Sequence, residues 1–136
     1  MAYNVLLVDD SVTVREVIAR TLALADIPLG AVYHAANGVE ALEMLEKSWI
    51  DVVFADLNMP LMNGIELVER MSQAGLMATI PVVIVSTDGS ITRVEELKAK
   101  GVSAYVRKPF TPELLRGVVE QVLGRTDEQE KGSDER

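Results

Sequence analysis

Three aspartates stand directly after short apolar runs, where a strand would end. Asp9 and Asp10 follow Val5–Val8, and Asp56 follows Val52–Ala55. In an open parallel sheet, ligands bind beyond the carboxyl ends of the strands. If the first and third strands are neighbours, the three carboxylates converge at one edge. Carboxylate oxygens bind hard divalent cations, and a carboxylate can also attack phosphorus to form an acyl phosphate.

Three carboxylates in one place need compensation, because two of them about 5 Å apart repel by roughly 3 kcal/mol at an effective dielectric near 20. Lys108, close after the run Ala104–Val106, supplies one positive charge and leaves a formal −2 for the four side chains. A divalent cation would neutralise that remainder, and oxygen-only ligands favour Mg²⁺ or Mn²⁺ over zinc.

A cation held there would recruit a phosphoryl group by bridging to its oxygens. The Ser86 hydroxyl, after the run Val82–Val85, and the Lys108 ammonium are the other groups that a phosphoryl group would need. Asp9 and Asp10 are adjacent and suited to holding the metal, whereas Asp56 stands alone on its strand. Asp56 is therefore the predicted nucleophile, with no histidine or cysteine at the site to compete.

The elements that must position these residues alternate regularly. Continuous apolar runs, typical of parallel strands covered on both faces, alternate with segments of helical periodicity. We predict an α/β fold of five βα units near residues 4–123, a doubly wound five-stranded parallel sheet with helices on both faces. The predicted strands are centred on Val5–Val8, Val32–Ala35, Val52–Ala55, Val82–Val85 and Ala104–Val106, and the clearest helical stripes lie within Val14–Leu22, Ala41–Leu45 and Leu114–Val122.

Local signals mark where several helices begin and end. Asn37 with Glu40 three residues later resembles a capping box. Thr111 stands before Pro112, which suits the first position of a helix. Gly75 and Gly101 follow helical segments, where glycine readily adopts the left-handed conformation.

Composition narrows the function classes. The chain has 136 residues, 49% of them hydrophobic, a net charge of −8 and no cysteine. So acidic a chain is a poor candidate for binding nucleic acid, and no apolar run reaches the length of a membrane span. We expect a cytoplasmic protein with one domain at residues 1–123 and a charged, disordered tail at residues 124–136.

Five motifs in order resemble the receiver domain of two-component response regulators over about residues 3–123. They are Leu7-Val8-Asp9-Asp10, Ala55-Asp56-Leu57-Asn58-Met59-Pro60, Met62-Asn63-Gly64, Val85-Ser86-Thr87 and Val106-Arg107-Lys108-Pro109-Phe110. Any one of them is weak, but together at matching strand ends they are specific. The resemblance implies the flavodoxin-like strand order 2-1-3-4-5, for which a chemotaxis member of this family is itself a standard example.

The resemblance also implies roles. Asp56 would accept a phosphoryl group from a sensor histidine kinase or a phosphotransfer protein. Asp10, Asp56 and the backbone carbonyl of Asn58 would bind Mg²⁺ directly, and Asp9 largely through water. Lys108 would pair with the phosphoryl oxygens, and the Lys108-Pro109 peptide would be cis.

The same resemblance implies a switch. Ser86 would move to hydrogen-bond the phosphoryl group, and Tyr105 would swing inward behind it. The output surface would be the fourth helix, the fifth strand and the fifth helix. Thr87 could narrow access to the phosphoryl group, while Asn58 and Asp88 occupy positions that tune dephosphorylation.

Other functions stay open at this point. One is a Mg²⁺-dependent phosphohydrolase with an aspartate nucleophile, although haloacid-dehalogenase-type enzymes space their two aspartates differently and carry insertions. Another is a flavin mononucleotide carrier of the flavodoxin type, whose phosphate Asp9 and Asp10 would repel. A third is a receiver used only for docking. Within the receiver interpretation, we expect a non-enzymatic, stand-alone regulator that acts on an output protein in chemotaxis or a phosphorelay, or a receiver fragment of a longer protein.

Overall fold

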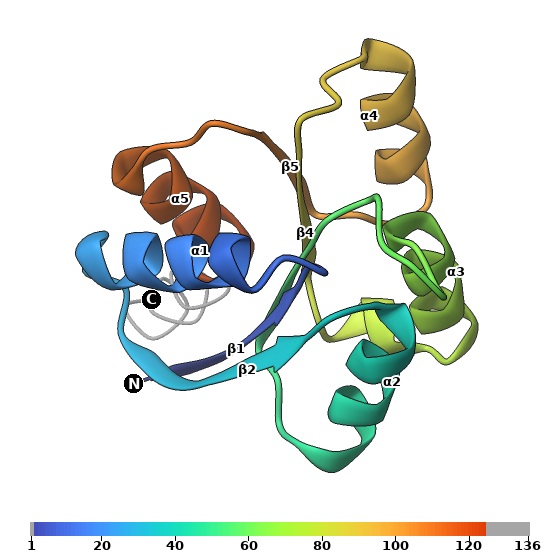
Figure 1. Ribbon diagram of the computed structural model, residues 1–136, viewed down its shortest axis with the longest axis horizontal. Coiled ribbons are helices and arrows are strands. Elements are labelled where there is room, and N and C mark those ends of the chain that lie inside the picture. The colour runs from blue at the N-terminus through green and yellow to red at the C-terminus, as the bar shows by residue number, and fades with distance from the viewer. Residues whose placement is uncertain (1, 125–136) are drawn as a thin grey trace, which may run out of the picture.

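The computed structural model describes residues 2–124 of the chain, and a five-stranded parallel sheet lies at its centre (Figure 1). The strands run in the order β2-β1-β3-β4-β5, which confirms the predicted fold class and strand order. Their bounds are β1 (Tyr3–Val8), β2 (Leu29–Ala35), β3 (Val52–Ala55), β4 (Val82–Ser86) and β5 (Ala104–Arg107).

A helix follows each strand. The bounds are α1 (Val12–Leu24), α2 (Gly38–Lys47), α3 (Gly64–Gln73), α4 (Ile91–Ala99) and α5 (Pro112–Val119), with a 3₁₀ turn at Leu76–Ala78 and a final π-helical turn at Glu120–Gly124. None of the helices within residues 2–124 is long and apolar enough to cross a bilayer. Apart from Gly124, the predicted tail lies outside the described residues.

The helices cover both faces of the sheet, with α1 and α5 on one side and α2, α3 and α4 on the other (Figure 1). Alternate strand residues serve the two faces: Leu6 and Val8 pack with α2 and α3, whereas Val5 and Leu7 pack with α1 and α5. Because both faces are buried, the strands need apolar residues at successive positions, which explains the continuous runs in the sequence.

Not every apolar residue within two of the predicted helix stripes is buried. Ile18 of α1 and Leu115 of α5 are buried as expected, but Val17 is 49% exposed and Leu114 is 45% exposed. Each exposed residue directly precedes the buried one, so it is rotated by about 100° around the helix and falls beside the core-facing stripe.

Local structure at the helix ends follows the sequence closely but not completely. Thr111 caps α5 ahead of Pro112, as predicted. Asn37 caps α2 by accepting from the Glu40 N–H, but the Glu40 carboxylate accepts from the Ala36 N–H, so the reciprocal bond of a capping box is absent from the bonds described there. Gly75 and Gly101 both have positive φ, at 76° and 105°, which confirms the predicted left-handed positions.

Candidate functional site

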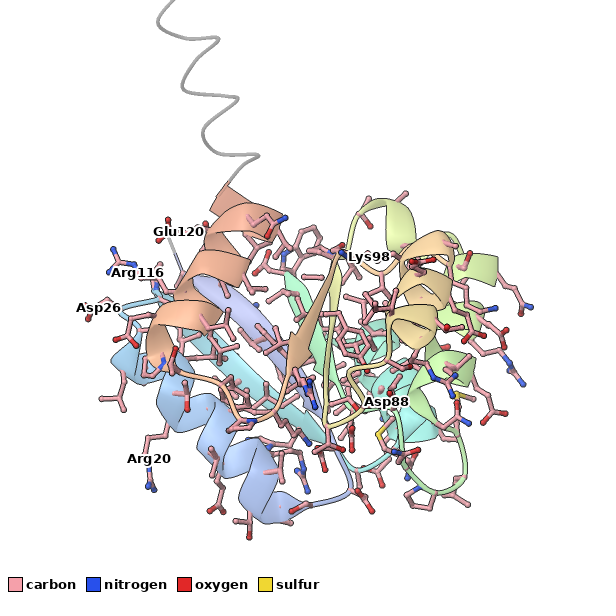
Figure 2. All side chains as sticks on the ribbon, turned by 90° about the horizontal axis from the view of Figure 1, so that it is seen from above. Arg20, Asp26, Asp88, Lys98, Arg116 and Glu120 are labelled. Atoms are coloured by element: carbon pink, nitrogen blue, oxygen red, sulfur yellow. The ribbon has the colours of Figure 1, made fainter. Side chains whose placement is uncertain are left out.

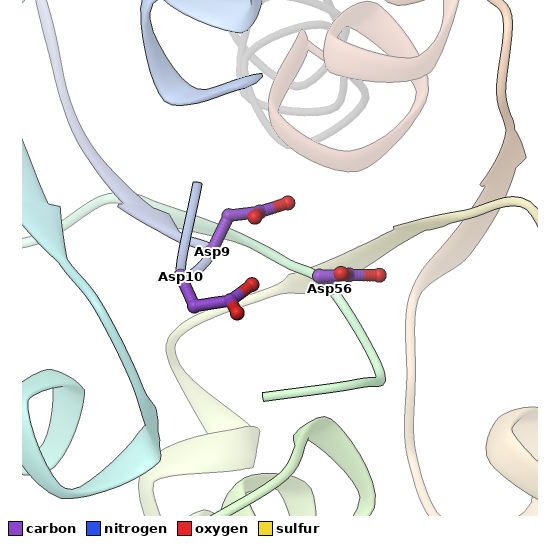
Figure 3. Close-up of side chains that lie close together, drawn as sticks. All are labelled: Asp9, Asp10 and Asp56. Atoms are coloured by element: carbon purple, nitrogen blue, oxygen red, sulfur yellow. The ribbon is translucent and has the colours of Figure 1, made fainter. Parts of the chain in front are cut away.

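The three aspartates at the strand ends meet at the carboxyl edge of the sheet (Figure 3). One carboxylate oxygen from each of Asp9, Asp10 and Asp56 can be chosen so that all lie within 4.8 Å of one another. They converge because β1 pairs with β3 in a register that sets Val8 opposite Ala55, so both strands end at the same level. This confirms the convergence predicted from the sequence.

Backbone hydrogen bonds fix the positions of two of these aspartates. The Asp9 N–H donates to the Ala35 carbonyl at 3.0 Å, and the Asp56 N–H donates to the Val8 carbonyl at 2.9 Å, which extends the strand pairing into the site. The Asp9 side chain accepts from the Ser11 N–H at 2.9 Å. The Asp56 side chain accepts from the Leu57 N–H at 2.8 Å, and this hydrogen bond fixes the orientation of its carboxylate.

A close backbone approach supports Asp56 from α3. The Gly64 N–H donates to the Leu57 carbonyl at 2.9 Å. A Cβ atom at Gly64 would lie 2.3 Å from the Asp56 carbonyl oxygen, far inside van der Waals contact. Only glycine therefore allows α3 to begin this close to the residue that follows β3.

Lys108 brings a positive charge to the acids across a long sequence separation. Its ammonium lies 3.4 Å from Asp9 Oδ2 and 4.0 Å from Asp56 Oδ1. The Lys108 N–H donates to the Ser86 carbonyl at 2.9 Å, and the Lys108-Pro109 peptide is cis, as the resemblance implied. Lys108 therefore lies where the sequence analysis expected it.

The surroundings of Asp56 make its carboxyl group harder to ionise than that of an exposed aspartate. Burial is the largest influence and raises the pKa of the Asp56 carboxyl group above its ordinary value. The Lys108 charge and the Leu57 N–H lower this pKa, whereas Asp9 and Asp10 raise it further. The net upward shift means that the negative charge of Asp56 is undercompensated by protein groups alone.

The donor set fits a hard divalent cation. The three clustered aspartates offer only oxygen, and Asp9 is 3% exposed while Asp10 is open to solvent. One lysine cannot neutralise three carboxylates, and a site with an open, hydrated side suits Mg²⁺ or Mn²⁺. Asn58, whose backbone carbonyl the resemblance adds to this set, has an exposed side chain two residues beyond Asp56.

Ser86 and Tyr105 both engage the segment between β4 and α4. The Ser86 side chain is fully buried, and its hydroxyl oxygen accepts from the Asp88 N–H at 3.2 Å. The Tyr105 hydroxyl donates to the Asp88 carbonyl, and burial raises the Tyr105 pKa. Both predicted switch residues therefore contact the backbone of Asp88. Within the described residues no hydrogen bond joins Ser86 to Asp56.

Asp88 also connects the segment to α4. Its carboxylate accepts from the Ser90 N–H at 3.0 Å and lies 3.5 Å from the Arg93 guanidinium. The Ser90 N–H is the largest influence that lowers the Asp88 pKa, and the Arg93 interactions lower it further.

Several supports of the site were not predicted from the sequence. Gly64 was quoted within a motif without a role, and Ser11 and Leu57 were not assigned any contact with the aspartates. The signal for Ser11 was present, because a serine directly before an apolar helical stripe is a typical N-cap, and its hydroxyl does accept from the Val14 N–H. The Gly64 approach had no signal in spacing, because it depends on how closely α3 packs.

Comparisons with known proteins agree on one family. The family model described as the response regulator receiver domain matches residues 5–120. The chemotaxis protein CheY1 of Helicobacter pylori is 38% identical over 125 residues, which cover 91% of this chain and 99% of that protein.

Solved structures of similar fold include chemotaxis proteins. The structure of Vibrio cholerae CheY4 at pH 4.0 has a TM-score of 0.78 and 36% identity, covering 90% of this chain and 100% of that one. CheY in the CheX-CheY-BeF3-Mg²⁺ complex of Borrelia burgdorferi has a TM-score of 0.80 and 26% identity, with 88% of each chain covered.

Proposed function

We propose that this chain, which belongs to the response regulator receiver domain family, is a signalling switch whose Asp56 accepts a phosphoryl group from a histidine kinase or a phosphotransfer protein. The observation that carries the proposal is the meeting of Asp9, Asp10 and Asp56 beside Lys108 at the carboxyl edge of the sheet. The curated relatives that it matches are chemotaxis signalling proteins rather than classical enzymes, which favours a switch over a phosphohydrolase.

Asp56 has the position that the acceptor needs. It alone of the three aspartates follows β3, and its second oxygen, Oδ2, has no described hydrogen bond while Oδ1 accepts from Leu57. In the proposed transfer this carboxylate forms a bond to phosphorus, the P–N bond of the donor phosphohistidine breaks, and the imidazole nitrogen keeps the electron pair. Lys108 would bind a phosphoryl oxygen, since its ammonium already lies between Asp9 and Asp56.

Mg²⁺ would be held by Asp10, Asp56 and the backbone carbonyl of Asn58, with Asp9 acting largely through water. When bound, the cation supplies charge neutralisation for the phosphoryl oxygens. The acid cluster within 4.8 Å supports this assignment. So does the structural neighbour from Borrelia burgdorferi, which is described with Mg²⁺ and a beryllofluoride group.

The proposed readout surface comprises α4, β5 and α5. Ile91 on α4 is 75% exposed and Leu114 on α5 is 45% exposed, so apolar side chains are available there for an output protein. Tyr105 lies on β5 between these helices, and its hydroxyl reaches the Asp88 carbonyl. We propose that phosphorylation draws Ser86 toward the phosphoryl group and moves Tyr105 further inward from its half-buried position. A cytoplasmic partner in chemotaxis or a phosphorelay would read the change.

The direct test is covalent labelling. With acetyl phosphate and Mg²⁺, intact-mass spectrometry should detect one phosphoryl group that is acid-stable and base-labile, and Asp56→Asn should abolish it. Asp26→Asn is the matched control, because Asp26 is an exposed aspartate in the turn before β2, at the opposite end of the strands. Labelling that survives Asp56→Asn would remove Asp56 as the acceptor, and continuous release of phosphate from added esters would instead support a phosphohydrolase.

A further inference from the structure

Arg107 packs on the backbone of the segment between β4 and α4. A Cβ atom built on Gly89 in this segment would lie 2.8 Å from both Cδ and Nε of Arg107 and 3.0 Å from its Cζ. Ordinary van der Waals contacts of a Cβ begin near 3.4 Å. The arginine side chain therefore occupies the volume that a side chain at position 89 would need.

The sheet directs Arg107 to this place. Arg107 is the last residue of β5, and the β4–β5 register pairs it with Ser86. Tyr105 comes two residues earlier, so its side chain leaves the same face of the strand. The Tyr105 hydroxyl donates to the backbone carbonyl of Asp88, and the Arg107 side chain covers Gly89. Two side chains of β5 therefore contact two successive residues of the segment between β4 and α4. Figure 2 shows Asp88 beside the start of α4.

The same segment sets the direction of the Ser86 hydroxyl. Ser86 accepts from the Asp88 N–H, one residue before the glycine that Arg107 covers. The resemblance implies that Ser86 moves toward a group on Asp56, and a displacement of its oxygen away from the Asp88 N–H would lengthen this hydrogen bond. Any contact that holds Gly89 in place therefore also favours the Ser86–Asp88 bond.

We propose that Arg107 is a positioning residue that holds the segment at residues 87–90 in the arrangement where Ser86 faces Asp88. It acts by packing, since no ion pair or hydrogen bond of its guanidinium is found among the described residues. By holding Gly89, Arg107 opposes the turn of Ser86 toward a group on Asp56. The effect on Ser86 rests on the proposed function, whereas the packing of Arg107 on Gly89 does not depend on it.

The chain offers two ways to remove this contact. Arg107→Ala deletes the covering side chain. Gly89→Ala displaces it, because the three nearest atoms to the new Cβ all belong to Arg107 and Gly89 does not have a positive φ that would strain alanine. Gly117→Ala is the matched control, since a Cβ there meets nothing within 4 Å.

Amide hydrogen exchange of the full chain without phosphodonor tests the packing. Arg107→Ala and Gly89→Ala should each speed exchange of the Asp88 amide about fivefold, while Gly117→Ala should leave it unchanged. The double variant should resemble either single variant, because both remove one contact. Unchanged exchange in both single variants, or effects that multiply in the double variant, would overturn the proposal.

Binding of beryllofluoride with Mg²⁺, measured by calorimetry, tests the consequence. Arg107→Ala and Gly89→Ala should bind this phosphoryl mimic about threefold more tightly than the unmodified chain. A general loss of structure would weaken binding, so tighter binding is a readout that a purely structural role does not give. Faster exchange with unchanged or weaker binding would overturn the positioning role. Failure of the unmodified chain to bind beryllofluoride would count against the proposed function, while the exchange data would still decide the packing.

Discussion

Asp56→Asn should stabilise the protein in Mg²⁺-free buffer at neutral pH. At an effective dielectric near 20, Asp9 and Asp10 within 4.8 Å each repel the Asp56 carboxylate by about 3.5 kcal/mol. Lys108 at 4.0 Å offsets about 4 kcal/mol of this repulsion. The balance is a repulsion of about 3 kcal/mol. Burial adds to it, whereas the Leu57 N–H and nearby water reduce it. We expect the free energy of unfolding to rise by about 1–2 kcal/mol.

The pH dependence follows from the raised pKa of Asp56, whose main cause is burial. The native state then binds more protons than the unfolded state, so Asp56 destabilises the fold as pH rises through the interval from the ordinary value of 3.8 to the raised one. The advantage of Asp56→Asn is therefore fully present above this interval. It should shrink as pH falls and disappear below about 3.8.

Urea unfolding at several pH values, with and without Mg²⁺, measures this difference. Glu43→Gln, at an exposed position within α2, controls for the removal of one negative charge from a chain of net charge −8. Saturating Mg²⁺ should stabilise the unmodified chain more than Asp56→Asn and so narrow the gap. An Asp56→Asn protein that is no more stable than the parent at pH 7, or a gap that does not change with pH, would refute the electrostatic account.

Three further substitutions test other parts of the site. Gly64→Ala should lower the free energy of unfolding by more than about 2 kcal/mol and reduce phosphorylation, because its Cβ would lie 2.3 Å from the Asp56 carbonyl oxygen; thermal unfolding and acetyl phosphate labelling measure both. Leu61→Asn should raise the free energy of unfolding in urea by about 0.5–1 kcal/mol, since Leu61 is 83% exposed at a φ of 65° that asparagine tolerates better; an unchanged or lower value would contradict backbone strain there. Asp10→Ala should weaken Mg²⁺ binding at least severalfold in calorimetry, and equal affinity would exclude it as a ligand.

The positions of the acids were predictable because they depend on regular features. Asp9, Asp10 and Asp56 each follow a continuous apolar run, and parallel strands bring such positions to one edge. What remained open was which strands are neighbours. The order that sets β1 beside β3 came from the resemblance, since periodicity does not distinguish one order of five strands from another.

Contacts that depend on irregular backbone were not predictable. Leu61 has a positive φ, and a leucine in the sequence gives no signal for this conformation. β2 begins at Leu29 rather than near Val32, because Tyr3 pairs with Leu29 across an irregularity in the β1–β2 register. The contact between Gly89 and Arg107 likewise depends on the path of a loop and not on spacing.

The electrostatic balance also determines how the proposed ligands affect one another. Three carboxylates and Lys108 carry a formal −2, and converting Asp56 to an acyl phosphate dianion would add a further negative charge. A divalent cation would then face a formal charge of −3 instead of −2. Its attraction to the site would therefore increase. Linkage requires the reciprocal effect, in which the cation favours the phosphorylated form by the same factor. The charge that phosphorylation would add at Asp56 is therefore what would make phosphorylation and cation binding cooperative. Asp9 and Asp10 would act by holding the cation close to that charge, so neutral substitutions there should weaken the coupling.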